Sequence, residues 1–197
     1  GYSDFWVVKI SNTGSIIWEK TYGGSDVDIA FGIEEGINGN FFVVGYTYSS
    51  DGDVSNNPHS SSSWIIKIDS LGTLLWEKSI QGESFDIDKT SDGGCVVTGE
   101  WMSIIKLDSN GNVLWQNSFG GSGGYSFASS VIQTTDGGYV LFGKTAATSG
   151  DVSNNYGGFD VWLIKLNSSG GLQWEKTYGG SDWDKAHSLV QLADSGF

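Results

Sequence analysis

Residues 6–20 have the sequence WVVKISNTGSIIWEK, and the same block returns three more times along the chain. Its copies are WIIKIDSLGTLLWEK at 64–78, SIIKLDSNGNVLWQN at 103–117 and WLIKLNSSGGLQWEK at 162–176. In each copy two apolar, β-branched runs flank a turn that ends in glycine, a pattern that predicts a β-hairpin. The predicted hairpins cover residues 4–22, 62–80, 101–119 and 160–178.

A second predicted hairpin lies between successive copies of this block. Residues 127–143, FASSVIQTTDGGYVLFG, place an alternating apolar run before a turn at 136–138 and a second apolar run after it. Residues 38–40 and 92–94 form the equivalent turns. The copies of the first block are 58, 39 and 59 residues apart. Two hairpins per repeat, with a minimal period near 40 residues, are typical of a propeller blade. The predicted fold class is therefore all-β, a β-propeller of four-stranded antiparallel blades.

The strand order within a blade follows from the order of the two hairpins. One blade has strand A at 127–134, B at 138–145, C at 160–166 and D at 171–178. The chain then contains about four repeats: strands C and D of one blade, three complete blades, and strand A of another. We predict one propeller domain over residues 1–197. We expect it to be a fragment of a larger propeller, because closure between the two ends would leave the shared blade almost without strand B.

The motifs of the repeat carry a family resemblance. DFWVVK at 4–9, Gly14, Trp18, YGGSD at 22–26 and GNFFVVGYT at 39–47 together resemble the bacterial β-propeller repeat family of SBBP type. The resemblance covers essentially the whole chain. It implies a secreted or surface-attached bacterial protein, as in the large surface proteins of Bacteroidota, and it implies no catalytic residues.

Charge and hydropathy exclude several classes of partner. The net charge is −13, and all ten basic residues are lysine. A nucleic-acid-binding protein needs a positive surface, so nucleic acid is not an expected partner. No apolar run approaches the roughly 20 residues of a membrane span, so membrane insertion is not expected either. The acidic composition favours solubility, and Cys95, inside an apolar run, is predicted to be a small buried hydrophobe.

The nine tryptophans divide into repeated and unrepeated positions. Seven recur at two positions of the repeat and are predicted to pack blade against blade; they are Trp6, Trp64, Trp162, Trp18, Trp76, Trp115 and Trp174. Trp101 and Trp183 fall outside the pattern. Because aromatic faces stack on sugar rings, these two are the candidate ligand-binding residues.

Two other features suggest alternative roles. The repeated lysine lies opposite the tryptophan face of its strand, which predicts a solvated side chain or an ion pair with an acid of a neighbouring blade. The long B–C loops, DGDVSNN at 51–57 and SGDVSNN at 149–155, carry alternating oxygen ligands. The candidate calcium ligands are Asp51, Asp53, Ser55, Asp151 and Ser153. The alternative is an Asx-rich turn that caps its own backbone. No other cofactor is predicted.

The sequence does not point to an enzyme. The acid pairs at 26/28 and 182/184 could serve a glycosidase, but they recur, whereas a catalytic pair normally occurs once. His59 and His187 are far apart in sequence. We therefore expect a non-catalytic extracellular or cell-surface module for binding, adhesion or scaffolding. It would belong to a larger chain or assembly, with a protein or a surface glycan as its partner. The alternatives are a lectin-like, glycan-binding propeller and, third, a propeller glycosidase or lyase.

Overall fold

A computed structural model describes residues 1–57 and 59–197 of the chain. The described part is built of β-strands with one short 3-10 helix, η1 (Ile37–Gly39). It divides into two compact units, unit 1 at Gly1–Ser84 and unit 2 at Phe85–Phe197.

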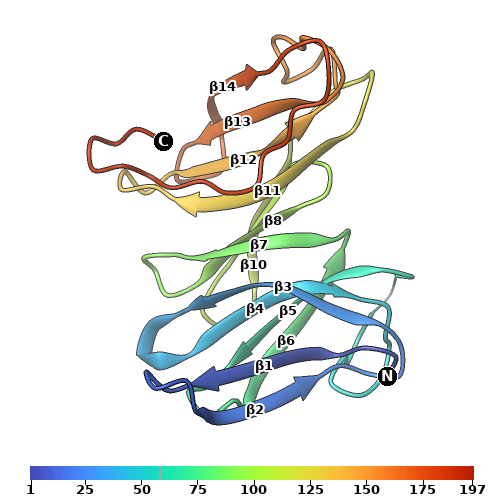
Figure 1. Ribbon diagram of the computed structural model, residues 1–197, viewed down its shortest axis with the longest axis vertical. Coiled ribbons are helices and arrows are strands. Elements are labelled where there is room, and N and C mark those ends of the chain that lie inside the picture. Colours follow the sequence, from blue (N-terminus) through green and yellow to red (C-terminus); the bar gives the residue numbers. More distant parts are fainter. Residues whose placement is uncertain (58) are drawn as a thin grey trace. The chain divides into compact units, whose positions relative to one another are not determined.

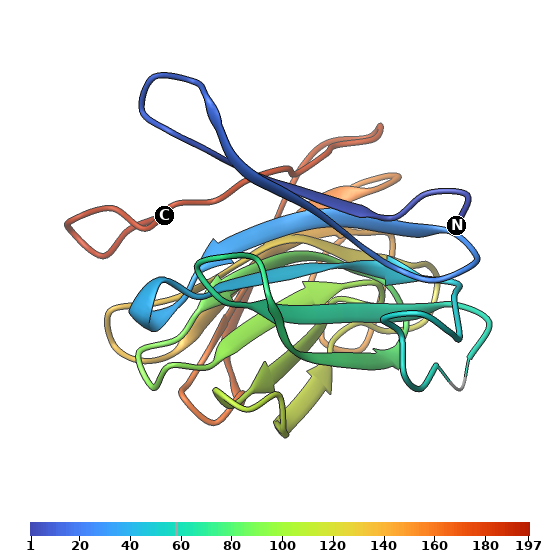
Figure 2. The same cartoon turned by 90° about the horizontal axis from the view of Figure 1, so that it is seen from below.

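Unit 1 contains a two-stranded and a four-stranded antiparallel sheet. The strands are β1 (Phe5–Ile10), β2 (Ile16–Tyr22), β3 (Asp28–Glu35), β4 (Phe41–Thr47), β5 (Ser62–Ile68) and β6 (Leu74–Gln81). The larger sheet has the order β3-β4-β5-β6, so each strand pairs with its neighbour in sequence (Figure 1). The β1–β2 hairpin lies on the β3 side of this sheet (Figure 2).

Unit 2 contains two four-stranded antiparallel sheets. The strands are β7 (Ser84–Lys89, which begins at the last residue of unit 1), β8 (Cys95–Gly99), β9 (Ser103–Leu107), β10 (Val113–Ser118), β11 (Ser126–Gln133), β12 (Tyr139–Thr145), β13 (Asp160–Leu166) and β14 (Leu172–Tyr178). The orders are β7-β8-β9-β10 and β11-β12-β13-β14. The predicted blades, three complete and one represented by its last two strands, are confirmed.

The four repeated hairpins share one register because their turns share one chemistry. The repeated lysine stands opposite the second tryptophan in each hairpin, as in Lys67 opposite Trp76 and Lys165 opposite Trp174. Asn167 Oδ1 accepts hydrogen bonds from the backbone N–H groups of Ser169 and Gly171, which closes the turn of the last hairpin. The turn glycines have φ between 79° and 82°; they are Gly14, Gly72, Gly111 and Gly170.

The core of each unit lies around the central strands of its sheets. All residues of β5 and β8 are buried, whereas the outer strand β10 is mostly exposed. Trp64 and Trp162 are fully buried, and each indole N–H donates to a glutamate of the next strand, Glu77 or Glu175. Trp6 has the same repeat position but is 64% exposed. Its sheet has only two strands, so the inner strands that would cover it are missing from the described chain.

The outer tryptophans pack between neighbouring sheets, as predicted, at two of their positions. In unit 1 the indole N–H of Trp18 donates to the Ser70 carbonyl, at 3.0 Å. In unit 2 the Trp115 ring lies 5.4 Å from that of Tyr139. Trp18 and Trp115 also cover the turn glycines Gly72 and Gly170 of the next hairpin, where a Cβ would lie within 3.3 Å of the indole.

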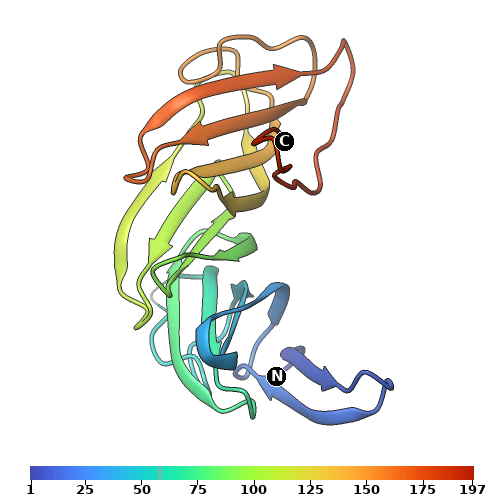
Figure 3. The same ribbon diagram turned by 90° about the vertical axis from the view of Figure 1, so that its left-hand side faces the viewer.

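The C-terminal segment differs from its prediction. It was expected to form strand A of a further blade, but no strand is assigned at residues 179–197 (Figure 3). Its turn is nevertheless formed, because Leu192 N–H donates to the Gly196 carbonyl as Thr134 N–H donates to that of Gly138. The described chain contains no second strand for this blade, so the segment has no ladder to join on that side.

The repeated lysines are more buried than predicted. Lys106 and Lys165 are 3% and 6% exposed. Their ammonium groups lie 2.9 Å from carboxylate oxygens of Asp92 and Asp136. These acids belong to the A–B turn of the same sheet, so the predictions of a solvated lysine and of an acid from a neighbouring blade are both wrong for these two. Lys67 Nζ instead lies 5.0 Å above the Phe42 ring, since the equivalent turn of its sheet carries Asn38.

The ion pair between the buried Lys165 and the exposed Asp136 gives a testable prediction. We expect Asp136→Ala to lower the free energy of unfolding by about 2 kcal/mol, because it leaves the Lys165 ammonium buried without its carboxylate. Asn167→Ala, which removes a neutral turn cap from the same sheet, should cost less than about 1 kcal/mol. Urea unfolding followed by circular dichroism measures both. Equal losses would show that the ion pair adds nothing to turn capping.

The same carboxylate makes stability depend on pH. Hydrogen bonds from Thr134 and then from Lys165 hold the pKa of Asp136 well below its ordinary value of 3.8. The stability that it contributes is therefore present above the unfolded pKa and is lost as pH falls through the lower, folded value. As pH falls below about 4, the difference in stability between the native chain and Asp136→Ala should shrink progressively.

Candidate binding surface

Trp101 lies at the centre of a tight turn between β8 and β9. Trp101 and Met102 have φ of 58° and 48°, and Ser103 N–H donates to the Glu100 carbonyl. Positive φ at both central residues is the geometry of a type I′ turn, which favours Asn-Gly. A bulky residue in this region costs roughly 1–2 kcal/mol. Met102 is fully buried and anchors the turn, while Trp101 is 56% exposed. The strained turn therefore presents an indole to solvent.

Trp183 follows β14 and is 68% exposed. Its indole meets the Phe159 ring edge-on, with the centroids 5.2 Å apart and an interplanar angle of 77°. A Cβ on Gly158 would lie 2.4 Å from Trp183 Cδ1, so a glycine is needed for this approach. The indole is thus held at a defined place on the surface of unit 2.

A continuous series of rings joins these two tryptophans. Trp101 lies 5.2 Å from Tyr125, Tyr125 lies 6.4 Å from Phe127, and Phe127 lies 6.1 Å from Phe159, which contacts Trp183. We call these five residues the aromatic row. The two candidate ligand-binding residues stand at its two ends, so the structure brings them onto one surface. Tyr125, at 58% exposure, is also open to solvent.

One cation lies within the aromatic row. Lys144 Nζ is 5.3 Å from the centroid of Phe127 and 4.8 Å from that of Phe159. Such placements are stabilised by the negative face of the rings. The lysine therefore sets a positive charge among the rings of a strongly acidic chain.

Unit 1 does not repeat the aromatic row residue for residue. Phe127 pairs with Lys144 in the β11–β12 ladder, and the equivalent pair in unit 1 is Ile29 with Tyr46. Sequence reasoning missed Tyr125, Phe127, Phe159 and Lys144. Tyr125 could have been found, because it has the same repeat position as Trp183: each precedes a segment predicted to be strand A. Phe127 and Phe159 could not, because they resemble the apolar residues of ordinary strands.

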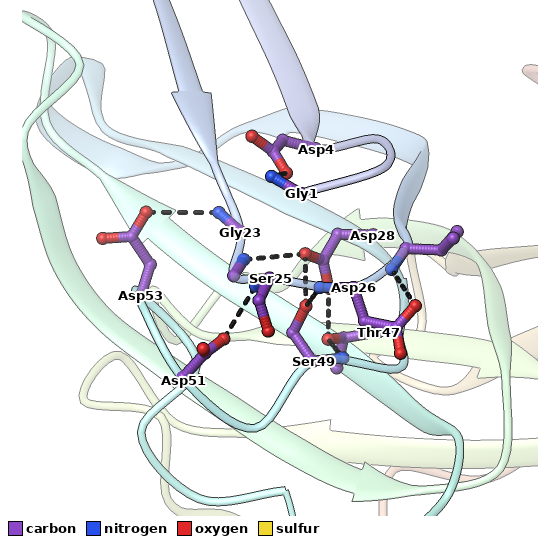
Figure 4. A network of polar contacts seen from close by, with 12 residues as sticks. Gly1, Asp4, Gly23, Ser25, Asp26, Asp28, Thr47, Ser49, Asp51 and Asp53 are labelled. Atoms are coloured by element: carbon purple, nitrogen blue, oxygen red, sulfur yellow. Dashed lines mark hydrogen bonds and ion pairs between the residues drawn. The ribbon is translucent and has the colours of Figure 1, made fainter.

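The candidate calcium ligands of the B–C loops bind neighbouring backbone. In unit 1, Asp51 Oδ1 accepts from Ser25 N–H at 2.7 Å, and Asp53 Oδ2 accepts from Gly23 N–H at 3.2 Å (Figure 4). The hydrogen bond from Ser25 is the main cause of a lowered pKa of Asp51. The carboxylates of this loop thus cap the backbone between β2 and β3 more than the backbone of the loop itself.

The second B–C loop is built in the same way. Asp151 Oδ2 accepts from Gly120 N–H at 3.1 Å, and Ser153 Oγ donates to Glu175 as Ser55 Oγ donates to Glu77. Within residues 1–57 and 59–197, no three Asp, Glu, His or Cys side chains gather in a group that could hold a metal. Calcium at these loops stays a prediction.

The two members of the acid pair at 26/28 have different surroundings. Asp28 is fully buried, and its carboxylate accepts hydrogen bonds from Thr47, Ser49 and Gly24 N–H (Figure 4). Asp26 is exposed and accepts from Val27 N–H. The Asp28 carboxylate thus serves to join the start of β3 to the end of β4.

Comparison with solved structures defines the fold. BamB from Moraxella catarrhalis is 16% identical, with a TM-score of 0.53 over 83% of this chain and 41% of that one. The Pan2 WD40 domain from Neurospora crassa is 12% identical, with a TM-score of 0.56 over 89% of this chain and 47% of that one. The fold is that of a β-propeller. The chain spans less than half the length of these two propeller chains.

Further comparisons add little to this result. A protein of unknown function from Bacteroides caccae is 14% identical, with a TM-score of 0.47 over 88% of this chain and 75% of that one. No protein-family model matches the propeller sequence, and no curated protein matches it. Among the described residues, no helix is long and apolar enough to span a membrane.

Proposed function

We propose that this propeller is a non-catalytic binding module that contacts its partner through the aromatic row. The observation that carries the proposal is the exposure of Trp101, Tyr125 and Trp183 at 56%, 58% and 68% on one connected surface. Tryptophan and tyrosine are enriched at the energetic centres of protein interfaces. The strained turn at Trp101 supports the same conclusion, because strain persists where a site needs a particular geometry.

The setting that we propose is an adhesion or scaffold module of a bacterial surface or secreted protein. It rests on the resemblance of the repeat to the SBBP type and on the aromatic row, which gives a larger chain a surface for a protein partner. The single domain over residues 1–197 is part of this proposal. A non-catalytic role is also supported by the hydrogen bonds of four carboxylates. Each of them accepts a hydrogen bond from a backbone N–H group; they are Asp28, Asp51, Asp53 and Asp151.

A surface glycan is the second candidate partner. The observation in its favour is the pair of exposed indoles at the two ends of the aromatic row, because aromatic faces stack on sugar rings. The two candidates use the same residues, so one set of variants tests both.

The experiment is binding of residues 1–197 to a glycan array and to an array of purified extracellular proteins. We expect a signal that falls at least tenfold in Trp101→Ala and in Trp183→Ala, with little change in melting temperature because both side chains are exposed. Trp6→Ala, an exposed tryptophan of unit 1, is the matched control and should bind normally.

The outcome decides between the partners. A signal on the protein array supports the first proposal, and one on the glycan array supports the second. Absence of signal on both arrays at high protein concentration, or signals that survive both substitutions, would overturn the aromatic row as the binding surface.

A further inference from the structure

Asp160, at the start of β13, has a buried carboxylate oxygen without a partner. The residue is fully buried. Its Oδ2 accepts a hydrogen bond from Tyr156 N–H at 2.6 Å, while its Oδ1 is buried and has no hydrogen-bond partner among the described residues. Leaving a charged oxygen unmatched inside a protein costs several kcal/mol. Such an atom points to a missing positive group.

A second carboxylate faces the same point. A Cβ built on Gly179 would lie 2.0 Å from Asp160 Oδ1 and 2.6 Å from Asp184 Oδ2. Asp184 is half-buried, and its Oδ2 also accepts from Gly180 N–H at 2.9 Å. The two carboxylate oxygens therefore lie close together against the same side of Gly179, an approach that a side chain at residue 179 would block.

The residues that follow Gly179 place backbone oxygens against Gly157. Gly157 follows Tyr156, the residue that binds the other oxygen of Asp160. A Cβ on Gly157 would lie 2.4 Å from both the Gly180 and the Ser181 carbonyl oxygens. The surroundings are thus rich in the carboxylate and carbonyl oxygens that hard cations prefer.

Unit 1 repeats the arrangement. A Cβ on Gly23 would lie 2.5 Å from Asp28 Oδ2 and 2.9 Å from Asp4 Oδ1, and Asp4 Oδ1 is again a buried atom without a hydrogen-bond partner in the described part of the chain. Here the nitrogen of Gly1 lies 3.5 Å from Asp4 Oδ1 (Figure 4). The other two hairpins place Ser62 and Trp101 where these have Asp4 and Asp160, so the acid pair is specific to two of the four linkers.

We propose that Asp160 and Asp184 bind a calcium ion. Two carboxylates match its charge, and calcium tolerates the irregular oxygen geometry of a loop better than magnesium does. The site differs from the B–C loops because it contains Asp160 Oδ1, a buried carboxylate oxygen that accepts no hydrogen bond from the described residues. The ion joins β13 to the segment after β14. Because Trp183 precedes Asp184, calcium also fixes one end of the aromatic row, a consequence that rests on the proposed function.

The test uses residues 1–197 freed of metal with a chelator. We expect calcium to raise the melting temperature by about 5 °C. Terbium, a calcium substitute, should luminesce on excitation of tryptophan, because Trp183 adjoins the site, and calcium should quench this emission by displacement. Asp160→Asn and Asp184→Asn should each weaken calcium binding at least tenfold by calorimetry, whereas Asp151→Asn should bind as the native chain does.

Three results would overturn the site. The first is that millimolar calcium does not change the melting temperature. The second is that calcium binding survives both Asp160→Asn and Asp184→Asn. The third is that binding is lost only in Asp151→Asn, which would place the ion in the B–C loop. If Asp160→Asn does not fold, judged by circular dichroism, the half-buried Asp184→Asn decides alone. Loss of array binding without loss of calcium binding would count against the proposed function and leave the site intact.

Discussion

Trp162→Ala is expected to lower the free energy of unfolding by about 4 kcal/mol. The side chain is fully buried in the core of unit 2, together with Met102, Ala128 and Leu141. Truncation removes the largest ring of that core and leaves a cavity that neighbouring strands of a hydrogen-bonded sheet cannot close. It also removes the indole N–H that donates to Glu175 at 2.7 Å. Urea unfolding followed by circular dichroism measures the loss.

Trp6→Ala is the matched control for this substitution. Trp6 has the same position in the repeat and the same sequence neighbourhood, but it is 64% exposed. Its replacement should cost less than about 1 kcal/mol, since little apolar surface is withdrawn from the core. Similar losses in the two variants would contradict the burial that distinguishes them.

Gly143→Ala is expected to cost about 3 kcal/mol or more. Gly143 lies in β12 opposite the point where the register of β11 shifts, between Ala128 and Ser130. A Cβ there would lie 1.9 Å from the Phe127 carbonyl oxygen and 2.7 Å from Ala128 Cα. Both are backbone atoms, so no side-chain rotation relieves the clash, and the two strands must separate.

Gly137→Ala separates this clash from the general cost of replacing glycine. Gly137 has φ of 79° in the turn between β11 and β12, and nothing lies within 4 Å of its Cβ position. Alanine there should cost only the free energy of placing a residue with a Cβ at a positive φ, about 1 kcal/mol. A loss at Gly143 no larger than that at Gly137 would show that the strands tolerate a side chain at the bulge.

The hairpins were predictable because they depend on local chemistry. A short turn with glycine at a positive φ, capped by the residue that opens it, fixes the register of the strands on either side. The four copies therefore agree in sequence and in structure, down to the pairing of Lys165 with Trp174. The order of the strands within each sheet followed from the same repeat.

The candidate site was predictable only in part. Trp101 and Trp183 were found because they break the repeat. Phe127 and Phe159 belong to the aromatic row as well, but a side chain at the end of a strand is identified as a surface residue only once neighbouring strands and loops are in place. The buried state of Lys165 was missed for a related reason. Alternation along β13 predicts which face a residue takes but says nothing of what covers that face.

The sequence by itself determined the repeat, the turns and the four-stranded blade, because these depend on residues close together in the chain. Tertiary structure decided which copies of a repeated residue are buried. Trp6 and Trp162 are equivalent in sequence, yet one is exposed and the other is enclosed. Tertiary structure also placed Asp160 against Asp184. Burial and charge neighbourhood depend on residues from other strands, and similar repeats acquire different chemistry when their neighbours differ.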